Sequence, residues 1–456
     1  AAMAEGRTIL DGMLYSDDVM VMMEALRNLG VKIEVSSEDN TCIMVEGTRG
    51  RIEAPSANET WLWMGNAGTA MRSLTAMLCA ANGKFVLYGE PRMHERPIQD
   101  LVDALNGVDD RFRIEYLENY GYPPLRIITS MGDQEENDRA RKMGNTIKVS
   151  GKVSSQFVSA VIMAAPFLFG SPTKQTEDIV IRADGLISAP YVEMTVRLAS
   201  TFGLDIAVEN ENENDPQSST NDMGGDAHIG YRIAAGFQYR SPGRLLIEPD
   251  ASSASYFLAC GALGSGPVTV RGLSKSSSLQ GDVAFVDVLE LMGANVSWDE
   301  NAVTISRGPQ GIHGVDVDLN HIPDAAMTIA PMAVQAKGET VIRGIGSWRV
   351  KECNRLDAMA TELRKVGAIV ETGPDWIRIT PPYLRSSSSG DELGFDPNHP
   401  VRLSTYDDHR MAMSLSLLSV GEDGREVEIE NPGCVSKTFP GYFEEFARMS
   451  PNLNRS

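Results

Sequence analysis

The chain has 456 residues, of which 42% are hydrophobic, so it is long enough for two or three domains with substantial cores. Its net charge of -21 argues against nucleic acid or an anionic membrane as a partner, and an anionic substrate would need a locally basic site. Five cysteines without a C-x-x-C pair indicate a reduced compartment rather than a zinc ribbon, and the longest apolar run, 157–170, is too short to span a bilayer.

The first residues predict the end of one helix and the start of a strand. Residues 1–6 are typical of a last helical turn with Gly6 just past it. A strand is expected at 7–10, followed by an amphipathic helix at 17–29. Gly30 and a short strand at 31–33 come next.

The same order of elements recurs along the chain. Polar residues lead abruptly into apolar, buried-type helices at 65–81, 154–165, 250–263, 323–334 and 408–418. β-like runs are expected at 84–88, 179–182, 268–271, 340–343 and 426–430, with amphipathic helices after them at 97–105, 189–202, 281–292, 352–366 and 441–449. The pattern predicts six copies of helix, strand, helix and strand, roughly 75–95 residues apart, of which only the first lacks its leading helix. About 30 residues are therefore expected ahead of Ala1, although ordinary α/β alternation is an alternative explanation.

The first polar stretch, 65–73, has the features of an anion site. Gly65 and Gly68 allow the backbone close to a ligand, and the first-turn N–H groups favour an anion such as phosphate. Arg72, one turn into the helix, can add a charge-assisted contact. A plain Gly/Thr cap on a buried helix explains the same residues.

Two further stretches concentrate cations near helix starts. In G-E-P-R-M-H-E-R-P-I, Arg96 precedes Pro97, the expected first helical residue, and so is biased out of the helix toward a ligand. In W-R-V-K-E-C-N-R, helical spacing would cluster Lys351 and Glu352 with Arg355, although solvated ion pairs are an equal alternative.

These motifs together resemble one enzyme family. G-N-A-G-T-A-M-R, G-E-P-R-M-H-E-R-P-I, D-A-S-S-A-S-Y-F-L-A, I-P-D-A-A-M-T-I-A, W-R-V-K-E and D-D-H-R-M-A-M are similar to those of 5-enolpyruvylshikimate-3-phosphate synthase, along essentially the whole chain. The resemblance implies an α/β fold of two similar domains, each of three helix-strand-helix-strand repeats, with the substrate site in the interdomain cleft. Domains are expected at 1–240 and 241–456, with the best hinge candidate at 239–243.

The reaction that the resemblance implies transfers the enolpyruvyl group of phosphoenolpyruvate to the 5-hydroxyl of shikimate 3-phosphate and releases phosphate. Asp324 resembles the general base, Glu352 the proton donor or acceptor at the methylene carbon, and Lys351 a third catalytic group. The residues implied to bind phosphoenolpyruvate are Asn66, Gly68, Thr69, Arg72, Arg96, Gln156, Arg355, His409, Arg410 and Lys437. Those implied to bind shikimate 3-phosphate are Ser154, Ser155, Gln156, Ser188, Tyr191, Asp324, Ser347 and Lys351. Neither a metal nor an organic cofactor is implied.

The chain departs from the family pattern in three places. The family's P-G-S-K-S-x-x-N-R segment is absent, so we expect the chain as printed to have little activity. Ser347 stands where the family usually has Asn, and Ser73 where it usually has Pro. Because Gly68 and Thr69 face the phosphoenolpyruvate pocket, where glyphosate also binds in this family, we expect Ser73 to reduce glyphosate sensitivity.

Two competing interpretations remain open at this stage. The related UDP-N-acetylglucosamine enolpyruvyl transferases carry a Cys near the G-E-P-R position, and 83–97 has none. The second competing interpretation is an inactive fragment or one module of a larger shikimate-pathway polypeptide. We expect a monomer, or such a module, in the cytoplasm, with a plastid as the alternative location. The segments 132–142, 209–225 and 385–392 are predicted to be surface insertions.

Overall fold

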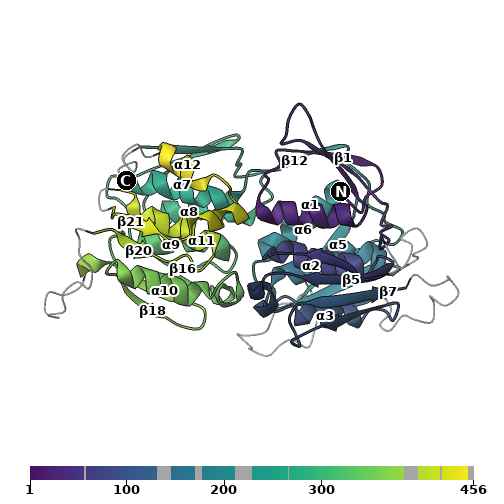
Figure 1. Ribbon diagram of the computed structural model, residues 1–456. Helices are drawn as coiled ribbons and strands as arrows, with labels where there is room; N and C mark the ends of the chain where they lie inside the picture. The colour runs from purple at the N-terminus through teal and green to yellow at the C-terminus, as the bar shows by residue number, and fades with distance from the viewer. Residues whose placement is uncertain are drawn as a thin grey trace. The chain divides into compact units, whose positions relative to one another are not determined.

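The structure is a computed structural model that describes residues 1–55, 58–130, 145–169, 177–210, 228–264, 266–384, 399–421 and 424–449. The predicted insertions at 132–142, 209–225 and 385–392 lie outside these residues, apart from Glu209 and Asn210, which end a strand. The chain forms two compact units, Ala1–Ile247 and Glu248–Ser456, here called unit 1 and unit 2 (Figure 1).

The second repeat is a four-stranded sheet with two helices. The second repeat runs β4 (Thr60–Trp63), α2 (Gly68–Leu78), β5 (Gly83–Tyr88), α3 (Gln99–Asn106), β6 (Phe112–Tyr116) and β7 (Leu125–Thr129), with a short 3-10 helix, η1 (Pro91–Glu95), before α3. β4 pairs with β5 in parallel, and β7 lies antiparallel between β5 and β6, which gives the order β4-β5-β7-β6. This repeat therefore has four strands, two more than the sequence analysis predicted for each repeat.

The third and fifth repeats have the same arrangement. In unit 1 the third repeat contains β8 (Thr146–Ser150), α5 (Ser155–Leu168), β9 (Ile179–Asp184), α6 (Ala189–Thr201), β10 (Ile206–Asn210) and β11 (His228–Ile233). In unit 2 the fifth contains β16 (Asp316–Asp318), α9 (Pro323–Ala333), β17 (Thr340–Arg343), η5 (Gly346–Val350), α10 (Arg355–Lys365), β18 (Ile369–Thr372), β19 (Ile377–Thr380) and η6 (Pro382–Leu384).

The other repeats have sheets of different composition. The first repeat contains β1 (Arg7–Asp11), α1 (Asp17–Asn28), β2 (Lys32–Val35) and β3 (Ile43–Glu46). The fourth repeat contains α7 (Ala251–Leu263), β13 (Val268–Arg271), η4 (Gly281–Ala284), α8 (Phe285–Leu291), β14 (Asn295–Asp299) and β15 (Ala302–Ser306). The sixth repeat contains β20 (Val401–Leu403), α11 (His409–Ser416), η7 (Leu417–Ser419), β21 (Val427–Ile429), η8 (Pro432–Lys437) and α12 (Tyr442–Met449). β12 (Arg244–Leu246) pairs in parallel with β1 and so completes the first sheet. This pairing explains why unit 1 extends to Ile247, whereas the sequence places the boundary after residue 240.

The polar-headed helices are the cores of the two units. α2 packs on α5 in unit 1, and α9 packs on both α7 and α11 in unit 2. Nearly every side chain of α5 and α7 is buried, as expected for helices that are apolar on all sides. The amphipathic helices α1 and α6 are more exposed. Gly30, Gly203, Gly293 and Gly367, each just past a helix, have φ of 83°, 83°, 99° and 88°, the left-handed conformation that ends a helix.

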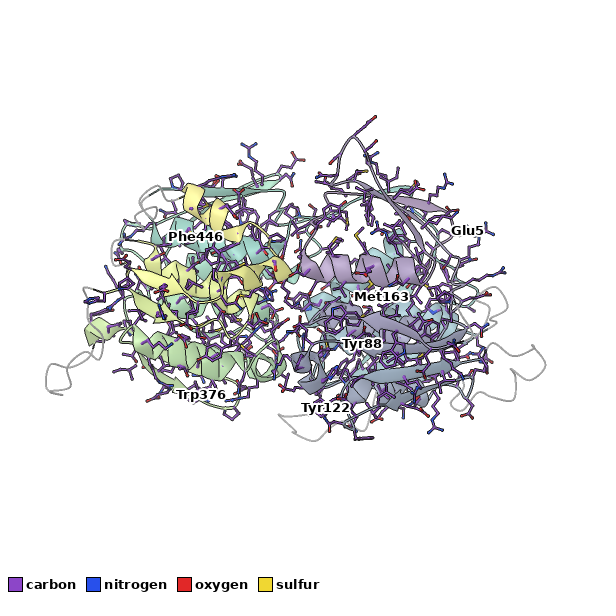
Figure 2. The ribbon with its side chains drawn as sticks, in the orientation of Figure 1. Glu5, Tyr88, Tyr122, Met163, Trp376 and Phe446 are labelled. Atoms are coloured by element: carbon purple, nitrogen blue, oxygen red, sulfur yellow. The ribbon has the colours of Figure 1, made fainter. Side chains whose placement is uncertain are left out.

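Aromatic side chains attach α12 to α7 in unit 2. Tyr442 lies 5.8 Å from Tyr256 and 5.6 Å from Phe446 between ring centroids, and Figure 2 labels Phe446 on α12. The last helix of the sixth repeat thereby packs against the buried helix of the fourth repeat. Within the described part of the chain, no helix is both long enough and apolar enough to cross a bilayer.

Four predicted boundaries are wrong. Residues 1–6 form turns and an isolated bridge from Glu5 to Arg240 rather than the end of a helix. α3 begins at Gln99 instead of Pro97, and the predicted helix 281–292 is divided into η4 and α8. α10 begins at Arg355 instead of 352, because Asn354 accepts the N–H of Asp357 and caps the helix there.

Candidate active site

In unit 1, two buried arginines meet the first residue of α2. Arg96 donates from Nη1 to the backbone oxygen of Asn66 at 2.9 Å and to its side-chain oxygen at 3.0 Å. Arg72 donates to the oxygen of Gly68 at 3.3 Å and to that of Pro97 at 3.2 Å. A Cβ on Gly68 would lie 2.6 Å from Arg96 Nη2 and 2.9 Å from Arg72 Nη1. Only glycine therefore leaves room for both guanidinium groups at this helix start.

The conformation of Arg96 follows from the residue after it. Its backbone is extended, with φ of -87° and ψ of 123°, as expected before Pro97, and it ends η1. The side chain can therefore reach past α3 to the start of α2. The prediction that Arg96 lies outside the helix is confirmed, although the helix begins two residues later than expected.

The start of α5 lies beside α2. Gln156 donates from Nε2 to Thr69 Oγ1 at 3.1 Å, and Ser154 caps α5 by accepting the N–H of Gln156 at 3.2 Å. Ser188, the residue before α6, is in the left-handed region with φ of 52°, and Tyr191 donates its N–H to the Ser188 oxygen. The N–H of Ile187 donates to the Gly151 oxygen, so the loops that carry Ser154 and Ser188 are neighbours.

In unit 2, Arg355 joins three carboxylates. Its side chain is 1% exposed. It donates to Asp408 Oδ2 at 2.7 Å, to Asp324 Oδ1 at 2.9 Å and to Glu352 Oε2 at 2.6 Å. A buried guanidinium with acceptors on three sides is held in one orientation.

Three other cations surround the same carboxylates. Lys351 Nζ lies 3.6 Å from Asp324 Oδ1, and Arg410 Nη2 lies 3.4 Å from Asp324 Oδ2. Lys437 Nζ lies 3.6 Å from Glu352 Oε1. With Arg355 and Asp408, this cluster holds four cations and three carboxylates. The local charge is therefore basic in a strongly acidic protein, which suits an anionic substrate.

Tertiary contacts, not helical spacing, assemble this cluster. Lys351 ends η5 and Glu352 lies in the loop before α10, so neither shares a helix with Arg355. The buried Trp348 donates from Nε1 to the Pro323 oxygen at 2.7 Å and fixes η5 against the start of α9. The predicted Glu352–Arg355 contact is present, and Lys351 contacts Asp324 of α9.

The cations determine the charge of Asp324. Burial alone would raise its pKa, but Arg410, Lys351 and Arg355 outweigh burial and hold the pKa well below its usual range. Burial lowers the pKa of His409 to about 3, although the nearby Asp408 and Glu352 act in the opposite direction. Near neutral pH, Asp324 is therefore ionised and His409 is uncharged.

Asp408 is a site residue that the sequence analysis did not single out. It is fully buried, caps α11 by accepting the N–H of Arg410 at 2.9 Å, and accepts from Arg355. Cys353 Sγ donates to Asp408 Oδ2 at 3.4 Å. Burial opposes its ionisation, but Arg355 holds its pKa below the usual value. An aspartate directly before α11 is a recognisable cap signal in the sequence. Its partner Arg355 lies 53 positions earlier, so the sequence did not show that the two residues meet.

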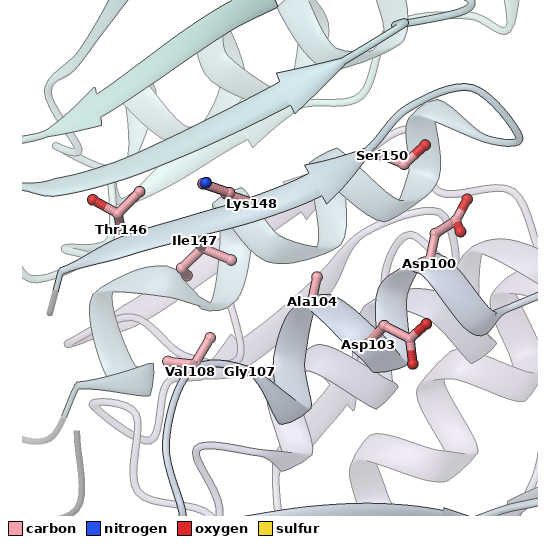
Figure 3. A pocket seen from close by; sticks show the side chains of 9 residues that line it. All are labelled: Asp100, Asp103, Ala104, Gly107, Val108, Thr146, Ile147, Lys148 and Ser150. Atoms are coloured by element: carbon pink, nitrogen blue, oxygen red, sulfur yellow. The ribbon is translucent and has the colours of Figure 1, made fainter. Parts of the chain in front are cut away.

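One cavity of unit 1 has a more acidic lining. In unit 1, a cavity of about 330 Å³ lies between α3 and β8, with Asp100 and Asp103 on its α3 side (Figure 3). Burial, together with Asp103 and Asp184, raises the pKa of Asp100. Lys148 is the one cation among the described residues of this lining and the two aspartates outnumber it, so the cavity is less suited to an anionic substrate than the unit 2 cluster.

Comparison with known proteins identifies the family. The family model described as EPSP synthase (3-phosphoshikimate 1-carboxyvinyltransferase) matches residues 1–446. The proteins named 3-phosphoshikimate 1-carboxyvinyltransferase from Salmonella schwarzengrund and Yersinia pseudotuberculosis are each 46% identical over 451 residues, which is 99% of this chain and 92% of theirs. The chain belongs to the EPSP synthase family.

Solved structures agree on the fold. The EPSP synthase of Acinetobacter baumannii matches with a TM-score of 0.69 and 23% identity, over 98% of this chain and 91% of that one. The enolpyruvyl transferase NikO of Streptomyces tendae matches with a TM-score of 0.64 and 16% identity, over 99% and 90%. The predicted α/β class with the enolpyruvyl transferase fold is confirmed.

The residues singled out by resemblance to the EPSP synthase family fall into two groups. Unit 1 brings together Asn66, Gly68, Thr69, Arg72, Arg96 and Gln156, with Ser154, Ser155, Ser188 and Tyr191 at neighbouring helix starts. Unit 2 brings together Asp324, Lys351, Glu352, Arg355, His409, Arg410 and Lys437. Ser347 lies in η5, next to Trp348.

Proposed function

We propose that this protein transfers the enolpyruvyl group of phosphoenolpyruvate to the 5-hydroxyl of shikimate 3-phosphate and releases phosphate. Membership of the EPSP synthase family supports this reaction. The observation that carries the proposal is the Arg355 cluster, in which an ionised aspartate and a glutamate lie among four fixed cations. The reaction joins two anions and moves two protons, and the cluster supplies charges for both tasks.

The cations are assigned to the substrate phosphates and carboxylates. By family resemblance, phosphoenolpyruvate is assigned to bind Arg355, Arg410 and Lys437 of unit 2, together with Arg96 and the N–H groups at Gly68 of unit 1. By the same resemblance, shikimate 3-phosphate is assigned to bind the serines at the starts of α5 and α6, Tyr191, Gln156, Ser347 and Lys351. On this assignment one substrate pair uses both groups of residues.

Asp324 is assigned the first proton. The 5-hydroxyl oxygen bonds to C2 of phosphoenolpyruvate while its proton passes to Asp324 and C3 receives a proton from Glu352. In the resulting tetrahedral intermediate, C3 returns a proton to Glu352, the C2–C3 double bond forms again and phosphate leaves. Without substrate, Asp324 is a weak base because the cations around it hold its pKa low. Substrate anions that bind Arg410 and Lys351 offset those charges and raise its basicity.

The proposed setting follows from the same family. We propose a monomer in the cytoplasm without a nucleic-acid partner. We also propose that the reaction uses neither a metal nor an organic cofactor, because proton transfer and charge stabilisation by side chains suffice for the chemistry. The net charge of -21 supports the exclusion of nucleic acid.

The test is phosphate release by the full-length enzyme. Phosphate should form only when phosphoenolpyruvate and shikimate 3-phosphate are both present, in a 1:1 ratio with the enolpyruvyl product seen by mass spectrometry. The control replaces shikimate 3-phosphate with UDP-N-acetylglucosamine. Turnover of the nucleotide sugar would favour the related transferase activity, and no turnover of either acceptor would favour an inactive protein.

A further inference from the structure

The connection between β20 and α11 has an unfavourable backbone. The N–H of Asp408 donates to the oxygen of Thr405 at 2.9 Å, and the two residues between them, Tyr406 and Asp407, have φ of 55° and 56°. Two successive left-handed residues closed by this bond form a type I′ turn. Residues with a Cβ are disfavoured in this region, and bulky ones such as tyrosine most of all. The turn is therefore strained directly before the His409-Arg410 pair.

Equivalent connections in other repeats lack this strain. The same backbone bond runs from Ala67 to Met64 before α2, and from Ile322 to Leu319 before α9. In the second repeat the left-handed position belongs to Gly65, with φ of 49°, and glycine accepts that conformation freely. Something in the sixth repeat must hold Tyr406 where the second repeat uses glycine.

One face of α10 holds both ends of the turn. Glu362 is fully buried and accepts from the Ser404 N–H at 2.9 Å and from the Tyr406 hydroxyl at 2.8 Å. Arg355, seven residues earlier and so two turns away on the same helix face, holds the Asp408 carboxylate. The turn is thus fastened to α10 before and after its strained residues.

Further contacts strengthen this attachment. Lys365 donates to Glu362 Oε2 at 2.6 Å, so the carboxylate is a charged acceptor with a cation beside it. Asn431 donates to Asp407 Oδ1 at 2.9 Å. Burial, and then the bond to Glu362, raises the pKa of Tyr406 to about 12, so its hydroxyl stays protonated and remains a donor.

We propose that Glu362 and Tyr406 are positioning residues, which hold the strained 405–408 turn and thereby fix the Asp408 carboxylate and the Arg410 guanidinium in the active site. The inference rests on the proposed function, because Arg410 is there assigned to phosphoenolpyruvate. Loss of the Tyr406 hydroxyl leaves the strain in place and removes the bond that opposes it. The turn then relaxes, and Arg410 moves with the start of α11.

The first experiment is Tyr406→Phe, compared with Tyr383→Phe. Tyr383 is also in unit 2, and its hydroxyl donates to the Ala336 oxygen at 3.0 Å and accepts the Gly338 N–H at 2.8 Å, but it makes no contact with the cluster among the residues described. Both variants should lower the melting temperature. Only Tyr406→Phe should raise KM for phosphoenolpyruvate, by about fivefold to tenfold, the effect of one hydrogen bond to a charged group.

A double-mutant cycle and a crystal structure complete the test. If Tyr406 acts through Arg410, its effect on KM should disappear in an Arg410→Lys background, whereas independent effects would add. In crystals of Tyr406→Phe, residues 406 and 407 should leave the left-handed region and the Arg355–Asp408 bond should lengthen. An unchanged KM, additive effects or an unchanged turn would each overturn the inference. If the unmodified enzyme had no turnover, the proposed function would fail, and the crystal structures would still decide this point.

Discussion

Replacing Asp408 by asparagine removes the charge at the centre of the unit 2 cluster with little change in shape. Asp408 accepts from Arg355 at 2.7 and 3.3 Å, and the backbone N–H of Arg410 donates to it at 2.9 Å. An amide can still accept one N–H, but its own NH₂ then faces the guanidinium donors of Arg355. Both sides of the Asp408–Arg355 pair are at most 1% exposed, so water cannot replace the lost acceptor.

The expected loss follows from that burial. Removing one partner of a buried ion pair costs about 3–5 kcal/mol, because the remaining charge stays buried without its counterion. Arg355 keeps Asp324 and Glu352, which places the expected value near the lower limit, about 3 kcal/mol. Because Arg355 loses the acceptor of its Nε, we also expect KM for phosphoenolpyruvate to rise about 10-fold or more.

Urea unfolding measures the loss, with Asp299→Asn as the matched control. Asp299 is also in unit 2 but is exposed at the end of β14, so its replacement should change the unfolding free energy by less than about 0.5 kcal/mol. The midpoint for Asp408→Asn should fall with little change in slope. A loss below about 1 kcal/mol, or an equal loss in both variants, would refute the reasoning.

The pH dependence of the unfolding free energy tests whether the stabilisation comes from the charge of Asp408. The folded-state pKa of Asp408 lies below its unfolded value, so its stabilisation is present above about pH 4 and is lost as the pH falls through the lowered folded pKa. The difference between the unmodified protein and Asp408→Asn should therefore be full at pH 7 and shrink below about pH 4. A difference that grew on acidification would contradict the assignment of the charge to Asp408.

Three further predictions concern the reaction. Asp324→Asn and Glu352→Gln should each lower kcat by about 10²-fold or more while KM changes much less, and steady-state kinetics showing near-normal kcat in either would remove its proton-transfer role. Because the pKa of His409 is lowered to about 3, its ring proton chemical shifts should stay constant from pH 5 to 8, whereas a titration near pH 6.5 would show a solvated ring. Ser73 lies in the second turn of α2, and its N–H faces the Thr69 carbonyl in the helix ladder. Ser73→Pro should therefore lower the glyphosate inhibition constant, measured against phosphoenolpyruvate, by about 5- to 30-fold, or 1–2 kcal/mol; equal constants would exclude a role for this position.

Local signals in the sequence were sufficient for the helices and their ends. The polar residues before α5, α7 and α11 cap those helices, since Ser154, Asp250 and Asp408 accept an N–H of the first turn. The extended backbone of Arg96 follows from Pro97, and the glycines after the helices take the left-handed conformation. Each of these features depends on residues a few positions apart.

The strands that begin the repeats were not predictable in the same way. β16 and β20 have three residues each, and Asp316-Val317-Asp318 has too few apolar residues to show a period of two. β12 joins β1 more than 200 residues earlier in the chain, so its pairing depends on which edge is available in the folded unit.

The sequence by itself determined the repeat pattern, the family and the residue types of the site, because hydrophobic periodicity, caps and motifs are local. Only the tertiary structure decided which charges meet. Lys351 contacts Asp324 because Trp348 fixes η5 against α9. Asp408 is a central residue because it accepts the Nε hydrogen bond of Arg355, which lies on another helix. Pairing of buried charges depends on distances between elements far apart in the chain, and those distances are set by packing.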